Sequence, residues 1–155
     1  IKNNPDVQVY TNTATGKLLD GANIPYILLE GRDSISIQGT LIEACDAQHV
    51  EIFEDIGQVQ NTGYFIADKL FYPGDAYANP EKPVEILTLP VAGPWARVAD
   101  VIRYARDINP QRAFPVHDAL LNEKGIGSQH KHCARELSAK GIDFISMSAG
   151  ESHEF

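Results

Sequence analysis

Two histidines and one aspartate stand where three predicted strands end. His49 follows the strand expected over residues 40–45, Asp75 follows "LFYPG", and His117 follows "RAFPV". Loops at strand ends can converge on one ligand, because the sheet holds them in place. Imidazole nitrogens and a carboxylate oxygen suit zinc or another first-row divalent cation, and ligands from separate loops can leave a coordination position open for water. The three side chains are therefore candidate metal ligands.

Each of these residues also has an ordinary structural interpretation. A single histidine after a strand is more often a hydrogen-bonded structural residue, and an aspartate after glycine more often forms a turn. Asp118, beside His117, could accept a hydrogen bond from that imidazole and orient a metal ligand, and capping its own loop is at least an equal alternative. Spacing alone leaves both interpretations open, with structural roles the commoner outcome.

Two further features carry weaker signals. The H-x-H triplet His130 to His132 falls in a predicted helix, where residues two apart point to different faces, so we interpret it as a solvated helix start. Trp95 could line a substrate pocket, but its helical spacing with Val98 and Ile102 is more typical of a core residue.

The composition bounds the class of protein. A chain of 155 residues suits one domain, which we take to span 1–155. Thirteen Lys and Arg against twenty-one Asp and Glu give a formal charge of −8, which disfavours nucleic-acid binding. No apolar run is long enough to cross a bilayer, so a membrane protein is not expected. Cys45 and Cys133 lie far apart, and we expect them to be buried thiols of a cytoplasmic protein.

Strand and helix patterns follow one another along the chain and predict an α/β fold. Strands are expected over 7–10, 26–30, 34–37, 40–45, 62–67, 70–75, 84–91, 112–116 and 143–147. Helices are expected over 13–21, 93–110 and 130–141, with an exposed loop over 48–61. In the antiparallel meander, we expect one buried face to be shared by Ile35, Ile37, Leu41 and Ala44.

Three segments carry a family resemblance: "PDVQVYTNTATGKLL", "NTGYFIADKLFYPGDAY" and "VEILTLPVAGPWARVADVIRYARDINPQRAFPVHDALLNE". Together they resemble the later part of metallo-β-lactamase-fold metal-dependent hydrolases, in particular the bacterial branch of ascorbate 6-phosphate lactonase-like proteins. The resemblance runs from the first residues to about Glu123, in order and with similar loop lengths. It implies an α/β fold that is part of a four-layer αββα sandwich.

The resemblance also implies roles for the three candidate ligands. In this family a histidine after the middle strands binds one zinc, an aspartate in a Gly-Asp step bridges two zincs, and a histidine after a late strand binds the other. These roles fall on His49, Asp75 and His117. The implied activity is hydrolysis of a small-molecule lactone, ester or phosphodiester by a zinc-bound hydroxide, with manganese or iron as alternative metals.

One family signature does not occur in this sequence. The motif H-x-H-x-D-H, which supplies four further ligands in the family, is absent, and the chain starts with Ile1. We therefore expect a chain without the first strands of the fold, either because further residues precede Ile1 or because it is a partial domain. A partial domain could serve as a binding or assembly module, with its strand edges covered by a completing chain or by a second copy. Hydrolase and module remain two alternatives.

Overall fold

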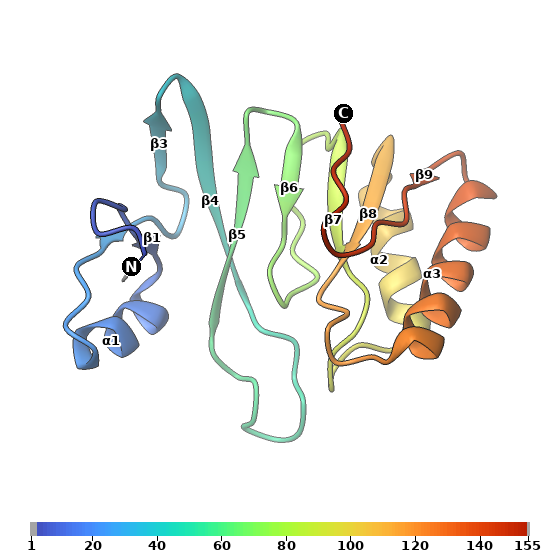
Figure 1. Cartoon of the computed structure of the whole chain (residues 1–155), viewed down its shortest axis with the longest axis horizontal. Coiled ribbons are helices and arrows are strands. Elements are labelled where there is room, and N and C mark those ends of the chain that lie inside the picture. Colours follow the sequence, from blue (N-terminus) through green and yellow to red (C-terminus); the bar gives the residue numbers. More distant parts are fainter. Residues whose placement is uncertain (1–2, 155) are drawn as a thin grey trace.

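A seven-stranded mixed sheet forms the centre of the computed structural model, which describes residues 3–154 (Figure 1). Its strands lie side by side in chain order, antiparallel from β3 to β6 and parallel from β6 to β9. The bounds are β3 (Ser34–Ile37), β4 (Thr40–Gln48), β5 (Gln60–Ile66), β6 (Leu70–Tyr72), β7 (Ile86–Pro90), β8 (Arg112–Val116) and β9 (Asp143–Phe144). The α/β prediction is confirmed, while the four-layer sandwich stays a prediction.

A small N-terminal unit lies beside the β3 end of the sheet (Figure 1). It consists of the parallel pair β1 (Tyr10–Thr11) and β2 (Ile27–Leu28) with helix α1 (Thr13–Gly21) between them. The side chain of Asn12 caps α1 by accepting a hydrogen bond from the Thr15 amide at 2.9 Å. The predicted end of this helix at Gly21 is confirmed, whereas the two strands are shorter than predicted.

Helices α2 (Val98–Ile108) and α3 (Glu123–Ser138) pack together over β7 to β9 (Figure 1). The predicted helix 93–110 begins late, because the amide of Ala96 closes a turn onto the carbonyl of Gly93. The predicted helix 130–141 begins early, at Glu123, because Asn122 caps it through the Gly125 amide. Within residues 3–154 no helix has the length and apolar character needed to span a membrane.

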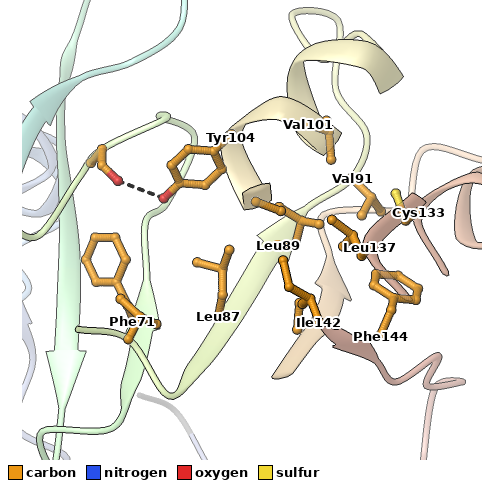
Figure 2. Packing of buried hydrophobic residues seen from close by; sticks show 14 of the residues in the cluster. Phe71, Leu87, Leu89, Val91, Val101, Tyr104, Cys133, Leu137, Ile142 and Phe144 are labelled. Carbon is orange, nitrogen blue, oxygen red and sulfur yellow. Dashed lines mark hydrogen bonds between the residues drawn. The ribbon is translucent and has the colours of Figure 1, made fainter. Parts of the chain in front are cut away.

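The helices bury one face of the sheet (Figure 2). Leu87 and Leu89 of β7 are fully buried and face α2, and all five residues of β7 are buried, as predicted for a strand covered on both faces. The hydroxyl of Tyr104 in α2 donates to the carbonyl of Ala78 at 2.8 Å, which ties the helix to the loop after β6. This packing makes the β6 to β8 region a rigid support for the loops that follow it.

The predicted buried face of the meander is wrong at Leu41. The two-residue turn at Gln38 and Gly39 pairs Leu41 with Ser36, while Ile42 pairs with Ile35. Directly opposed residues share one face of a sheet, so Ile42 replaces Leu41 on the face of Ile35 and Leu41 is 38% exposed.

Candidate functional site

The loops that follow β4, β6, β7 and β8 lie at one edge of the sheet. β4 and β6 are both antiparallel to β5 and therefore run in the same direction, and β7 and β8 are parallel to β6. Their carboxyl ends consequently meet at the edge that lies lowest in Figure 1. His49 follows β4, Asp75 follows β6 and His117 follows β8. Topology alone thus brings the three predicted residues to one edge.

The three side chains meet at a single oxygen atom. Nε2 of His49 and Nε2 of His117 each lie 3.4 Å from Oδ2 of Asp75. The side chains are partly buried, with 15% of His49 and 31% of each of the other two exposed. A separation of 3.4 Å exceeds the usual range of a hydrogen bond between nitrogen and oxygen. The predicted convergence of His49, Asp75 and His117 is therefore present, with room between the donor atoms.

A backbone contact fixes the tautomer of His49. Its Nδ1 lies 2.6 Å from the carbonyl oxygen of Val50. A carbonyl oxygen only accepts hydrogen bonds, so Nδ1 must carry the proton. In the neutral ring, Nε2 then has a free lone pair, and this lone pair faces the carboxylate of Asp75. A cation bound between Nε2 and the carboxylate would contact both atoms.

The donor set suits a first-row divalent cation. Ligands bound at the usual zinc distances in tetrahedral geometry are separated from one another by about 3.4 Å, and both imidazole nitrogens lie 3.4 Å from the aspartate oxygen. A histidine whose second nitrogen donates to a carbonyl is also the common arrangement in metal ligands. Among residues 3–154, however, no group of three or more His, Cys, Asp and Glu side chains is arranged so that it could hold a metal ion as it stands. The structure brings two imidazole nitrogens to one carboxylate oxygen, and a metal at this position stays a prediction.

Asn61 holds the turn that presents Asp75. Its side-chain oxygen accepts from the Asp75 amide at 2.9 Å, and its side-chain nitrogen donates to the Pro73 carbonyl at 2.7 Å. Gly74 lies between these contacts with a φ of 69°, and an added Cβ would lie 2.3 Å from the Asn61 oxygen. The "YPGD" sequence therefore needs glycine at this position. Asn61 could not be named from the sequence, because nothing in a strand pattern shows that its amide reaches the next turn.

Trp95 forms an aromatic wall beside the two imidazoles. Its ring contacts His49 and His117 edge to face, with centroid separations of 5.9 and 6.0 Å, and it contacts Tyr77 at 5.6 Å. Trp95 is buried but precedes α2, so its assignment to a helical stripe is wrong. Burial raises the pKa of Tyr77 to about 12, so this phenol stays protonated near neutral pH. The buried Trp95 ring therefore packs apolar surface against both imidazoles.

His117 has a backbone conformation that is unfavourable for a residue with a side chain. Its φ is 63°, in the left-handed region, directly after the regular β8 strand. Such conformations cost free energy and often occur at functional sites, where the surrounding structure maintains them. The turn at His117 therefore depends on contacts made by its neighbours.

Asp118 has a different contact from the one predicted. Its Oδ2 lies 3.1 Å from Nε2 of His130, which belongs to α3. His130 is only 8% exposed and packs edge to face against Phe144, so its assignment to a solvated helix start is wrong. His132, two residues further on, is exposed, in agreement with the expectation that the two histidines point to different faces. Orientation of His117 by Asp118 stays a prediction.

A polar hollow opens beside Asp75. It has a volume of about 270 Å³ and lies between the N-terminal unit and the β5 to β6 region. Hydroxyl and amide side chains dominate its lining, among them Tyr10, Thr15, Gln60 and Thr62. The hollow offers hydrogen-bond donors and acceptors next to the cluster, as a binding site for a polar small molecule requires.

A comparison of sequences identifies the family. Residues 8–117 match the family described as the beta-lactamase superfamily domain, and this span includes all three converging residues. The chain belongs to the beta-lactamase superfamily. The coarse family assignment from the sequence is thereby confirmed, whereas the lactonase-like branch stays a prediction. The match extends over more than half of the chain and includes the N-terminal unit as well as most of the sheet.

Known relatives show similarity over most of the chain. Protein Rv0786c of Mycobacterium tuberculosis is 27% identical over 126 residues, which are 78% of this chain and 58% of that protein. A protein of Parabacteroides distasonis described as a candidate metal-dependent hydrolase matches with a TM-score of 0.69 and 23% identity, over 92% of this chain and 64% of that one. Igni18, a metallo hydrolase of Ignicoccus hospitalis, matches with a TM-score of 0.71 and 14% identity, over 99% of this chain and 71% of that one.

The two solved structures are similar to this chain in fold. Because their sequence identity to it is only 23% and 14%, they show the fold alone. The chain spans less than two thirds of the length of the mycobacterial relative and of the Parabacteroides protein.

Proposed function

We propose that the protein is a metal-dependent hydrolase whose cation is held by His49, Asp75 and His117. The observation that supports this most strongly is the approach of two imidazole Nε2 atoms to one aspartate oxygen, each at 3.4 Å. The match to the superfamily over residues 8–117 supports it independently.

A divalent cation at this position would supply Lewis-acid chemistry, polarising a scissile carbonyl or phosphoryl oxygen and making a water molecule more acidic. The residues of the chain do the positioning. The Val50 carbonyl holds the proton of His49 on Nδ1, which keeps Nε2 available. Asn61 fixes the turn at Asp75, and the Trp95 ring packs apolar surface against both imidazoles.

Zinc is the proposed metal, because two nitrogen donors and one oxygen donor match its borderline softness; manganese and iron are the alternatives. The three residues suit one ion with an open position. A second ion, as the family resemblance implies, would require ligands beyond these three, with Asp75 as the bridge.

The proposed substrate is a small molecule with a lactone, ester or phosphodiester bond. The hollow beside Asp75 supports this class, since its hydroxyl and amide lining can bind the polar groups of a small molecule. The formal charge of −8 argues against a nucleic acid as substrate.

Zinc titration of the purified protein tests the proposal. We expect the protein to bind zinc and Asp75→Ala to weaken binding at least about a hundredfold, because the variant removes the atom that both imidazoles approach. Asp55→Ala, at an exposed aspartate in the loop after β4, is the matched control and should bind zinc like the wild type. The loaded protein is then assayed against lactone, ester and phosphodiester panels. Equal binding by the wild type and Asp75→Ala, with no hydrolysis, would refute the proposal.

The alternative proposal is a binding or assembly module, either completed by another chain or forming a homo-oligomer. Its specific support is the outermost strand β3, which pairs with β4 at one end of the seven-stranded sheet formed by the described residues. In that case Asp75→Ala leaves the assembly unchanged. Light scattering of the wild type and of Asp75→Ala measures the mass of each assembly. A binding module should give the same mass with and without the Asp75 carboxylate.

A further inference from the structure

Helix α3 contacts the site edge through His130. Nε2 of His130 lies 3.1 Å from Oδ2 of Asp118, and the residue before Asp118 is His117. His130 is 8% exposed and its ring packs against Phe144 of β9. An imidazole held on two sides in this way has little freedom to move, so it can fix the position of the carboxylate that it contacts.

The neighbouring residue of α3 contacts the end of a second strand. Nε2 of Gln129 donates to the carbonyl of Val91 at 2.5 Å, just after β7. The amide of Val91 in turn donates to the carbonyl of Val116 at 3.0 Å, and Val116 directly precedes His117. Consecutive residues of one helix therefore hold the loops after β7 and β8, which carry Trp95 and His117.

The part of α3 that follows Gln129 and His130 is fixed in the core. Cys133 and Leu137, one and two turns further along α3, are fully buried in the main core together with Leu87 and Leu89 of β7 (Figure 2). A helix fixed to the sheet in this way can maintain an unfavourable backbone conformation nearby. His117, with its φ of 63°, has such a conformation.

We propose that Gln129 and His130 form a clamp, named here the α3 clamp, that positions His117 and Trp95. The inference rests on the proposed function, in which His117 binds the cation. Gln129 and His130 touch neither cation nor substrate in this proposal. They act through Val91 and Asp118, and their removal should loosen the His117 turn without unfolding the protein.

Zinc affinity of His130→Leu is the first test, because leucine keeps apolar bulk beside Phe144 and removes the contact to Asp118. We expect its dissociation constant for zinc to rise about tenfold, the lower end of the effect of residues that orient metal ligands. His130→Gln, which restores a side-chain N–H, should recover most of the affinity. His132→Ala is the matched control on the same helix and should bind like the wild type, because His132 is exposed.

Hydrogen exchange in the metal-free protein tests the clamp separately from zinc binding. In His130→Leu, the amides of residues 117–121 should exchange at least tenfold faster, while those of β7 remain protected. Unchanged exchange and unchanged zinc affinity would refute the clamp. If the wild type and Asp75→Ala bind zinc equally, the proposed function fails, and faster exchange in His130→Leu would still support the clamp as the element that orders this loop.

Discussion

The described residues include two histidine–carboxylate clusters, around Asp75 and Asp118, that differ in how their atoms meet. In the closed cluster, His130 and Asp118 lie 3.1 Å apart and the histidine is buried. In the open cluster, His49 and His117 approach the same oxygen of Asp75 at 3.4 Å each. The closed cluster has its two side chains within hydrogen-bond distance, whereas in the open cluster each imidazole lies beyond the usual hydrogen-bond range of the carboxylate oxygen. In the proposed function, the same residue types serve stability in the closed cluster and ligand binding in the open cluster.

The stability gained on zinc binding should be the largest difference between the open and the closed cluster. At a zinc concentration about a hundredfold above the dissociation constant, we expect about 2.7 kcal/mol of added stability, because the metal binds the folded state. Asp75→Ala should lose this gain, and a chelator should remove it from the wild type. Thermal unfolding with zinc and with chelator measures the effect. A gain that persists in Asp75→Ala would place the metal outside the open cluster.

Without metal, the loss of a histidine should destabilise the closed cluster more than the open cluster. His130→Leu leaves Asp118 without its partner and should destabilise the fold by about 2 kcal/mol. His49→Leu removes an imidazole that lies beyond the usual hydrogen-bond range of Asp75 and loses only its Nδ1 contact with the Val50 carbonyl, so its free energy of unfolding should fall by about 1 kcal/mol. Urea denaturation with chelator present provides both values. Similar losses in the two variants would mean that the open cluster is also a structural pair.

Gly74 should be the sensitive glycine of the open cluster. Gly74→Ala places a Cβ against the Asn61 side chain at a φ of 69°, and we expect a loss of about 1.5 kcal/mol together with weaker zinc binding.

Gly21→Ala is the matched control for Gly74→Ala. No atom lies within 4 Å of the added Cβ at Gly21, the last residue of α1, so stability should remain equal or rise slightly. Zinc affinity and urea midpoints of both variants are compared. If both variants behave alike, the Asn61 contact does not fix the turn at Asp75.

The smallest effect near neutral pH concerns Cys133, which lies one turn after His130. Burial raises the pKa of its thiol to about 11, above the ordinary value near 9. As the pH rises, the thiol of the unfolded state therefore loses its proton before that of the folded state. Below pH 9 the thiol does not change the stability of the fold, and between pH 9 and 11 it lowers that stability. Labelling by a thiol reagent at pH 8 should be slow in the wild type and faster in His130→Leu. Equal labelling rates would mean that the closed cluster does not hold this part of α3.

Much of the fold could be predicted from the sequence because its signals are local. The continuous apolar run around Leu87 to Leu89 predicted a buried strand, and Gly21 predicted a helix end, and both are observed. The early start of α3 was missed because Gly125 and Gly127 weaken the helical pattern. Leu41 was assigned to the wrong face, since register depends on the turn and a shift of one residue reverses every side chain.

The sequence by itself determined which residue types stand at the strand ends, because strand periodicity and turn residues are local properties of the chain. His49, Asp75 and His117 could be named on that basis, together with the resemblance to metallo-β-lactamase-fold hydrolases. Only the tertiary structure decided that both imidazoles face one oxygen, that Asn61 fixes Asp75, and that Asp118 contacts His130. These contacts join residues that are distant in the chain, and their distances follow from strand direction and helix packing.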